Sequence, residues 1–252
     1  MQFDIVTIFP RMIEAGLAEG ILARAVQRGL FRVRVRDLRD FTDDRHRTVD
    51  DVPYGGGPGM VLKVGPIFRA VEAIRRDGGE SQAIVLVSPH GRRFTQAEAG
   101  RLAALDRVTV LCGRYEGIDD RVREGLATEE LSIGDYVLSG GELPALVIVD
   151  AVARLIPGVV GDEDSVAGDS FSRGLLDFPH YTRPAEFGAL KVPEVLVSGH
   201  HGEIRKWRKR RALELTLTKR PDLLAEAELD VEEQEILREL MERQKGAADG
   251  RD

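Results

Sequence analysis

The sequence has little cysteine, few aromatic residues and no long hydrophobic run. Its 252 residues include one cysteine, Cys112, which excludes an internal disulfide and a thiolate metal cluster and fits a reducing compartment. No apolar stretch approaches the roughly 20 residues that span a bilayer, and the first ten residues lack the pattern of a secretion signal. We therefore expect a cytoplasmic protein that does not bind a membrane.

The composition is that of a globular chain whose charges are unevenly distributed. Hydrophobic residues make up 42% of the sequence and charged residues 31%, and the formal net charge is −7. Overall acidity argues against a polyanionic partner, but acidic residues concentrate at 226–235 and basic residues at 205–220. A local basic surface is what nucleic-acid binding requires, so the charge pattern leaves that function open.

Periodicity predicts an α/β domain followed by helices. Up to about residue 156, short β-rich runs alternate with helical patterns, which is typical of a layered domain with a mostly parallel sheet. Expected strands are 3–8, 31–35, 83–87, 108–112 and a stretch near Leu131. Expected helices are one opened by Pro66, one capped by Thr95, an unusually apolar one at 144–156 that would be buried in the domain or against a second subunit, and two more at 203–218 and 231–244.

The change in composition after Pro157 and Gly158 predicts the domain organisation. The residues that follow are small, polar and acidic, without helical or strand periodicity. We expect a first domain at 1–160, a linker at 161–171, a helical domain at 172–246 and a frayed tail at 247–252.

Three glycine-containing loops follow predicted strands. They are 88–91, 113–117 and 132–144. In open α/β sheets, ligands bind at the carboxyl ends of strands, and glycine lets a ligand approach the backbone. Each loop alone is explained by a tight turn between strand and helix. Three on one edge of a sheet favour a ligand pocket.

A fourth glycine cluster, at 54–60, resembles a phosphate-binding loop only superficially. No Gly-Lys-Ser/Thr ending follows, and the strand, helix and acidic residue of a dinucleotide site are missing. We interpret this segment as a wall or lid over a neighbouring site.

Longer sequence blocks are more specific than any single glycine pattern. They are HRTVDDVPYGGGPGM (46–60), LCGRYEGID (111–119), SIGDYVLSGGELPA (132–145), RLIPGV (154–159), DSF (169–171), GLLDFPHYTRP (174–184) and EIRKWR (203–208). Together, and in this order, they resemble the bacterial tRNA (guanine-N1)-methyltransferases, which modify the guanosine immediately 3′ of the anticodon, at tRNA position 37. The likeness extends from the first predicted strand to about Leu224.

This resemblance implies a fold and a cofactor. The family belongs to the SPOUT superfamily, whose parallel sheet contains a deep trefoil knot, here followed by a small helical C-terminal domain that would bind tRNA. The knotted domain would bind S-adenosylmethionine in its loops, chiefly through backbone groups. Matched by motif, the cofactor-binding residues are Ser88, Pro89, Gly113, Arg114, Tyr115, Gly117, Ile133, Gly134, Asp135, Tyr136, Val137, Leu138, Gly140, Gly141 and Pro144.

The resemblance also implies catalytic roles. N1 of neutral guanine carries a proton, so its methylation needs a base and a group that stabilises charge on O6. The family match assigns these roles to Asp169 and Arg154, and makes Glu116 a third candidate, near the guanine or near a Mg²⁺ ion that the family's activity is associated with. From the residues alone, Asp169 could be a solvated loop carboxylate and Arg154 a cation at a helix end.

The same blocks imply partners. Residues expected to contact the tRNA anticodon stem-loop are Asp50, Gly59, His180, Arg183, Arg205, Trp207 and Arg208. The family is homodimeric, with an active site shared between subunits. Two other functions remain conceivable from the residues: a nucleotide-hydrolysing α/β enzyme, which the absent lysine-bearing loop counts against, and a non-catalytic RNA-binding module built around the basic helix.

Overall fold

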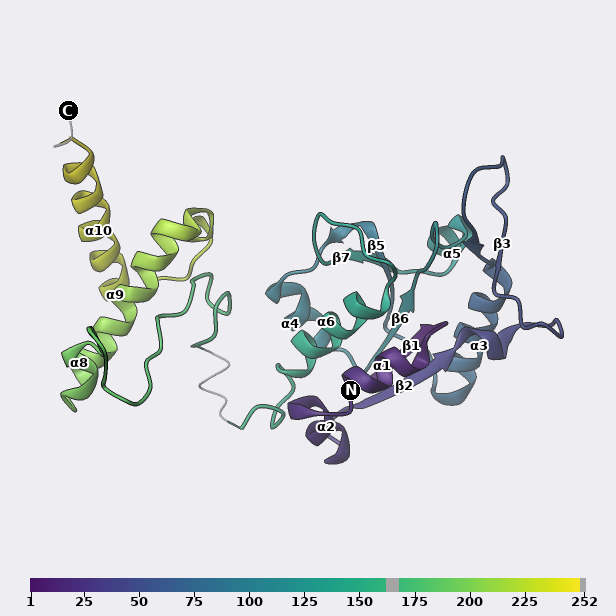
Figure 1. Cartoon of the computed structure of the whole chain (residues 1–252), viewed down its shortest axis with the longest axis horizontal. Coiled ribbons are helices and arrows are strands. Elements are labelled where there is room, and N and C mark those ends of the chain that lie inside the picture. The colour runs from purple at the N-terminus through teal and green to yellow at the C-terminus, as the bar shows by residue number, and fades with distance from the viewer. Residues whose placement is uncertain (162–167, 250–252) are drawn as a thin grey trace. The chain divides into compact units, whose positions relative to one another are not determined.

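The computed structural model describes residues 1–161 and 168–249, and the chain divides into two compact units (Figure 1). Unit 1 is Met1–Glu163 and unit 2 is Asp164–Asp252. Of the predicted linker at 161–171, residues 162–167 lie outside the described part of the chain.

Unit 1 contains a five-stranded parallel sheet. Its strands, in spatial order, are β2 (Arg32–Asp37), β1 (Gln2–Thr7), β6 (Arg107–Cys112), β5 (Ala83–Arg93) and β7 (Glu129–Ser132). Every neighbouring pair is parallel, and all five predicted strands are present. The predicted α/β class with a parallel sheet is confirmed. The trefoil knot stays a prediction, because strand order and pairing do not test it.

Alternating side chains of the strands enter two separate cores. In β5, Val85 packs in a core with α1, α2, α4 and α6, whereas Ile84 and Leu86 pack in a second core with α3 and α5. Successive residues of a strand point to opposite faces, so this segregation means that helices cover both faces of the sheet (Figure 1). Such double burial explains why the central strands are continuous hydrophobic runs.

The helices of unit 1 are α1 (Pro10–Gly16), α2 (Gly20–Gln27), α3 (Val64–Gly78), α4 (Gln96–Ala103), α5 (Asp120–Gly125) and α6 (Glu142–Ala153), with a 3-10 turn η1 (Leu38–Phe41). The predicted cap of α4 is confirmed, since the Thr95 side chain accepts a hydrogen bond from the Glu98 amide at 3.4 Å. Helix α6 buries one side in the core but leaves Leu143 and Val147 exposed, at 51% and 47%. It is therefore only partly covered within unit 1.

Two short antiparallel strands, β3 (Asp50–Asp51) and β4 (Val61–Leu62), flank the glycine-rich segment. The Leu62 amide donates to the Gly117 carbonyl at 3.0 Å, and the Glu116 amide donates to the Met60 carbonyl at the same distance. The segment is thus attached to the loop after β6.

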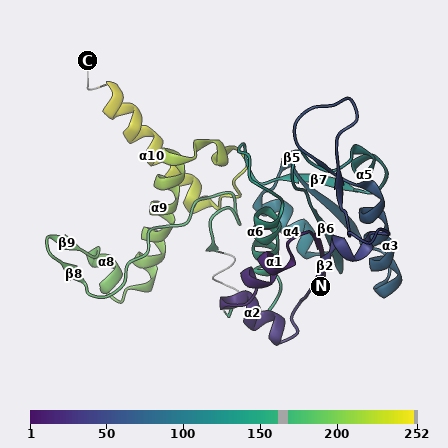
Figure 2. The same ribbon diagram turned by 45° about the vertical axis from the view of Figure 1, so that its right-hand side comes forward.

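Unit 2 consists of helices, one small hairpin and an irregular segment that precedes the hairpin (Figure 2). Its elements are β8 (Glu186–Phe187), β9 (Leu190–Lys191), α8 (Glu194–Val197), α9 (His201–Lys219), the 3-10 turn η2 (Pro221–Ala225) and α10 (Val231–Asp249). The core is formed by Leu175, Leu213, Ile236 and Leu240. The predicted helical C-terminal region is confirmed; α10 extends to Asp249, and residues 250–252 of the predicted frayed tail lie outside the described residues.

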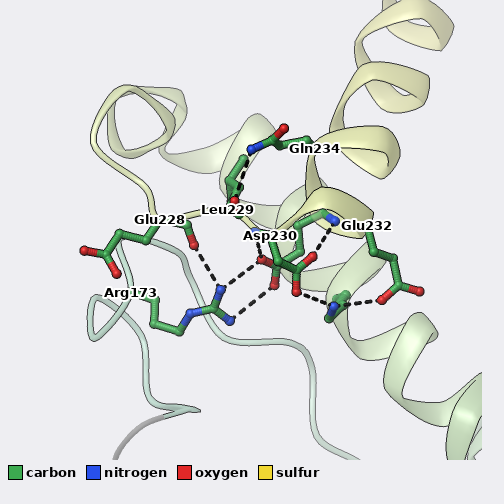
Figure 3. Close-up of polar contacts among 8 residues, drawn as sticks. Arg173, Glu228, Leu229, Asp230, Glu232 and Gln234 are labelled. Carbon is green, nitrogen blue, oxygen red and sulfur yellow. Dashed lines mark hydrogen bonds and ion pairs between the residues drawn. The ribbon is translucent and has the colours of Figure 1, made fainter.

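A polar network fixes the start of α10 (Figure 3). Asp230 accepts a hydrogen bond from the Glu233 amide at 2.8 Å, and Glu233 accepts one from the Asp230 amide at 2.9 Å, which is a reciprocal capping box. Arg173 donates to Glu233 at 2.9 Å and to the Glu228 carbonyl at 2.9 Å, and Lys209 of α9 binds Asp230 at 2.6 Å. The network therefore ties the segment around Arg173 and helix α9 to α10.

Part of the basic stretch is neutralised by these acids. Lys209 pairs with Asp230 and Glu232, and Arg210 pairs with Glu239. The acidic C-terminal segment and the basic segment, which the sequence separates, thus partly neutralise each other in space. The basic surface available on α9 is smaller than the sequence suggests.

None of the helices in the described residues has both the length and the hydropathy of a membrane span.

Candidate active site

The first predicted loop is a wide bulge within β5. Val87 and Arg92 both lie opposite Leu131, so residues 88–91 leave the regular pairing with β7. A Cβ atom on Gly91 would lie 2.4 Å from the backbone nitrogen of Leu131, which makes glycine necessary at this close approach. The strand therefore continues beyond its predicted end at residue 87, and the bulge projects Ser88 and Pro89 from the sheet.

The second and third loops are joined to each other by backbone contacts. Arg114 and Gly140 form an antiparallel bridge, and the Gly141 amide donates to the Gly113 carbonyl at 2.8 Å. A Cβ atom on Gly141 would lie 2.8 Å from the Cα atom of Cys112. The loops can approach this closely only because residue 141 has no side chain.

All three loops border one cavity of about 410 Å³. Of the fifteen predicted cofactor-binding residues, fourteen line it: Ser88, Pro89, Gly113, Arg114, Tyr115, Gly117, Ile133, Gly134, Tyr136, Val137, Leu138, Gly140, Gly141 and Pro144. Asp135 is the exception; its side chain is 97% exposed and lies 3.8 Å from Arg93. The predicted cluster of glycine loops therefore encloses a volume suited to a small ligand.

Several charged lining residues were absent from the sequence prediction. Asp120 and Arg123 of α5 and Glu130 of β7 line the cavity, as does the predicted Glu116. Asp120 and Arg123 pair with each other at 2.7 Å. Asp120 and Arg123 lie just beyond the family-like block that ends at residue 119. Their position at the start of the helix that follows the second loop is a sequence signal that could have identified them.

A buried carboxylate lies behind the loop pair. Glu142, in the first turn of α6, is completely buried, accepts a hydrogen bond from the Thr7 hydroxyl at 2.6 Å and pairs with Arg114 Nε at 2.8 Å. Arg114 also donates to the Ser139 carbonyl at 3.0 Å. Its guanidinium thus links the loop after β6, the loop before α6 and the end of β1. Burial, and next the nearby Glu142 charge, raises the pKa of the Cys112 thiol well above its usual value, so this thiol stays protonated.

Two residues predicted to contact tRNA lie beside the cavity. Asp50 of β3 interacts with Tyr115: burial is the main cause of the raised pKa of the Tyr115 hydroxyl, and the Asp50 carboxylate, to which the hydroxyl is hydrogen-bonded, adds to it. A Cβ atom on Gly59 would lie 2.4 Å from Glu116 Oε1. The glycine-rich segment therefore forms a wall against the Tyr115 and Glu116 end of the cavity.

The two main predicted catalytic residues are not among the residues that line the cavity. Arg154 follows the last turn of α6, where its amide donates to the Asp150 carbonyl at 3.1 Å. Asp169 belongs to unit 2, where its carbonyl accepts a hydrogen bond from the Ser172 amide at 3.2 Å. Their predicted roles remain predictions.

The remaining predicted tRNA contacts lie in unit 2. His180, Arg183 and Arg208 line a second cavity of about 410 Å³. The Trp207 ring lies 6.3 Å from the Tyr181 ring, between centroids, and Arg205 is exposed on α9.

The residues that the structure describes contain no group of three or more His, Cys, Asp or Glu side chains placed to hold a metal ion. No set of ligands for the expected Mg²⁺ is therefore assigned.

Comparison with known proteins decides the family. The family model for tRNA (guanine-1)-methyltransferase TrmD matches residues 1–226. The chain belongs to this family. Among curated relatives named tRNA (guanine-N(1)-)-methyltransferase, the one from Pelotomaculum thermopropionicum is 55% identical over 242 residues, covering 96% of both chains. Those from Geobacter metallireducens and Bacillus licheniformis are 52% and 50% identical; each alignment covers 96% of this chain, and 98% and 100% of the relative.

Proposed function

We propose that this protein is an enzyme that transfers the methyl group of S-adenosylmethionine to N1 of guanosine 37 of tRNA, next to the anticodon. The observation that carries the proposal is the cavity at the carboxyl edge of the parallel sheet, bordered by the three glycine loops of a chain that belongs to this methyltransferase family. No observation favours either the nucleotide-hydrolysing enzyme or the non-catalytic module as a second candidate.

The cavity fits the proposed donor in size and charge. Its volume of about 410 Å³ lies within the range of small-molecule sites. Glu116 and Glu130 line it with carboxylates, whereas the Arg114 charge is balanced by buried Glu142 and the Arg123 charge by Asp120. When bound, S-adenosylmethionine supplies a methyl group activated by a positively charged sulfonium, and an excess of carboxylates suits that charge.

The loops would hold the donor mainly through their backbone. Gly113 and Gly140 bring the backbone to the cavity without intervening side chains, and the hydrogen bond from the Gly141 amide to the Gly113 carbonyl fixes the spacing of the two loops. Arg114 and Glu142 are positioning residues in this proposal, because they hold the two loops together from behind the cavity.

Asp169 would act as the general base and Arg154 as the cation near O6. The Asp169 carboxylate takes the proton from N1 of guanine while the bond from N1 to the methyl carbon forms and the bond from that carbon to sulfur breaks. Arg154 stabilises the negative charge that accumulates on O6 during transfer. We derive no step through Mg²⁺, since no set of ligands for it is assigned.

We further propose that the protein is a homodimer whose active sites are shared, with Asp169 of the partner subunit serving the cavity of unit 1. The exposed Leu143 and Val147 on α6 support an apolar contact between subunits. Sedimentation velocity should show a dimer, and Val147→Lys should shift it toward monomer. A parent protein that sediments as a fully active monomer would contradict this part. We expect the enzyme to act in the cytoplasm, on tRNA.

The reaction is tested with unmodified full-length tRNA and S-adenosylmethionine labelled in its methyl group. The proposal predicts label on one guanosine, at position 37 and on N1, identified by nuclease mapping and mass spectrometry. Replacing guanosine 37 with adenosine should abolish incorporation. Label on a different nucleotide, or none with correctly folded protein, would refute the proposal.

A further inference from the structure

A second cavity lies entirely within unit 2 and is lined by the segment after Leu175, by helix α8 and by the first half of α9. Figure 2 shows helix α8 next to the start of α9. The volume of the cavity is about 410 Å³. Its apolar lining comes from Val192, Leu196 and Ile204. Two rings and a planar guanidinium also line it, from Phe178, His180 and Arg208. An apolar site lined by a few polar and aromatic groups is typical of ligand pockets.

The planar groups in this cavity lie close to one another. The guanidinium carbon of Arg208 lies over the Phe178 ring, 4.8 Å from its centroid, and the His180 ring lies 4.6 Å from the Phe178 ring between centroids, tilted by 41°. Tyr181, 46% exposed, also lines the cavity. Aromatic rings and guanidinium planes are the groups on which proteins stack unpaired nucleic-acid bases.

The charges near the cavity are those of a phosphate-binding surface. Among the described residues, Arg183, Arg205 and Arg208 are exposed and form no salt bridge, whereas the next basic residues of α9, Lys209 and Arg210, are paired with acids of α10. Arg183 and Arg208 at the cavity, and Arg205 beside it, are thus not neutralised by a salt bridge within the described residues. Cations without a carboxylate partner are the ones best able to contact the phosphates of a polyanion.

We propose that this cavity receives one unpaired base of the tRNA anticodon loop, which stacks on the Phe178, His180 and Arg208 group while Arg183 and Arg205 face the adjoining phosphates. This inference rests on the proposed function for the identity of the RNA, but the cavity's role is in binding and not in methyl transfer. Unit 2 would thereby hold the loop by a base other than the one that is methylated.

The first experiment measures the dissociation constant of an anticodon stem-loop RNA by fluorescence anisotropy. Arg208→Lys keeps the positive charge but removes the stacking plane, and we expect it to weaken binding about tenfold, within the range measured for single base-stacking contacts. Arg210→Lys is the matched control, because Arg210 lies on the same helix, does not line the cavity and is paired with Glu239. Its effect should stay within about twofold, since lysine keeps the positive charge and Arg210 takes no part in the proposed contact. Equal melting temperatures for both variants and the parent would show that the fold is retained.

The second experiment identifies the base by removing loop bases one at a time. In a series of stem-loops, each with one abasic nucleotide, the penalty of Arg208→Lys should disappear for one position and persist for the others, because the two changes remove the same contact. An Arg208→Lys effect no larger than that of Arg210→Lys, or a penalty that persists with every abasic RNA, would overturn the proposal.

The two proposals fail separately. Methylation of full-length tRNA by the parent protein, with no special effect of Arg208→Lys on stem-loop binding, would remove only the base pocket. A parent protein that shows the expected binding pattern and does not methylate tRNA would remove the proposed reaction and leave the pocket.

Discussion

Arg114 Nε donates a hydrogen bond of 2.8 Å to Glu142 Oε2, and the Glu142 side chain is completely buried. This pair joins two cavity loops, and its two residues are 28 positions apart in the sequence. The sequence does not reveal it, because nothing in the spacing of Arg114 and Glu142 indicates that β6 and α6 place them together.

Replacing Glu142 should damage both stability and donor binding. In Glu142→Gln the Arg114 guanidinium remains largely buried but loses its counter-charge. Removing one partner of a buried ion pair lowers the free energy of unfolding by about 3 kcal/mol. Urea unfolding should show this loss, and calorimetry should show weaker S-adenosylmethionine binding. Asp222→Asn removes the partner of Arg220 in an exposed pair and serves as the control. Equal stability of Glu142→Gln and parent would contradict the role given to the pair.

Gly141→Ala should disrupt the cavity. The added methyl group would lie 2.8 Å from the Cα atom of Cys112 and 2.9 Å from the backbone nitrogen of Gly113, so the two loops must separate. We expect the dissociation constant for S-adenosylmethionine to rise at least about tenfold, since small displacements of positioned groups are costly.

The control for that change is Gly100→Ala. Gly100 lies within α4 with open space around it, so alanine should stabilise the protein by about 0.5–1 kcal/mol through helix propensity and leave donor binding unchanged. Comparable donor affinities for the two variants would argue against close contact between the loops as the basis of binding.

Asp169→Asn tests the proposed base. Single-turnover methylation should slow by about 10²–10⁴-fold, the usual contribution of general acid–base catalysis, with tRNA and donor affinities within a few-fold of the parent. Glu226→Gln, an exposed carboxylate of the same unit, should react at the parent rate. If the rate of Asp169→Asn stays within a few-fold of the parent, another group takes the proton.

The capping box of α10 gives a pH-dependent prediction. The hydrogen bond from Lys209, followed by that from the Glu233 amide, lowers the pKa of the Asp230 carboxyl below its usual 3.8. A carboxyl whose pKa is lower in the folded protein adds stability above its unfolded pKa, and that stability is lost as the pH falls through the lower, folded value. The stabilisation should therefore be complete at pH 7 and disappear below about pH 3.8.

Two variants separate the charge from the cap. Asp230→Ala should lose about 1 kcal/mol at pH 7, because alanine cannot accept the Glu233 amide. Asp230→Asn keeps an acceptor and should lose less, with its deficit vanishing as the pH approaches 3. Denaturation of the parent and both variants at pH 7, 5 and 3 measures these differences. A deficit of Asp230→Asn that is independent of pH would contradict the charge contribution.

The sheet was predictable because its central strands are buried on both faces. Continuous apolar runs such as 108–112 fit few structures other than a buried strand. All five predicted strands form, four of them within a few residues of their expected bounds. The extension of β5 to Arg93 was not predictable, since residues 88–91 have the composition of a turn. Pairing of β5 with β7 resumes at Arg92, because Leu131 lies opposite both Val87 and Arg92, the two ends of the bulge.

The cavity was predictable as a group of loops but not in its charges. Glycines after parallel strands indicate a ligand edge, and fourteen of the fifteen named residues line it. Glu130 reaches the cavity through the pairing of β7 with β5, which sequence spacing does not report, whereas Asp120 and Arg123 follow directly after the second loop and could have been considered on that ground. Likewise, the pairing of Lys209 and Arg210 with α10 depends on how two helices pack, so the basic stretch alone overstated the available cations.

A crystal structure of the protein grown with S-adenosylmethionine tests the central claim most directly. The account predicts electron density for the donor inside the cavity of unit 1, with its polar groups within hydrogen-bond distance of backbone atoms in 113–117 and 133–141. Well-ordered loops around a cavity that excludes the donor at saturating concentration, or donor bound elsewhere on the protein, would contradict it.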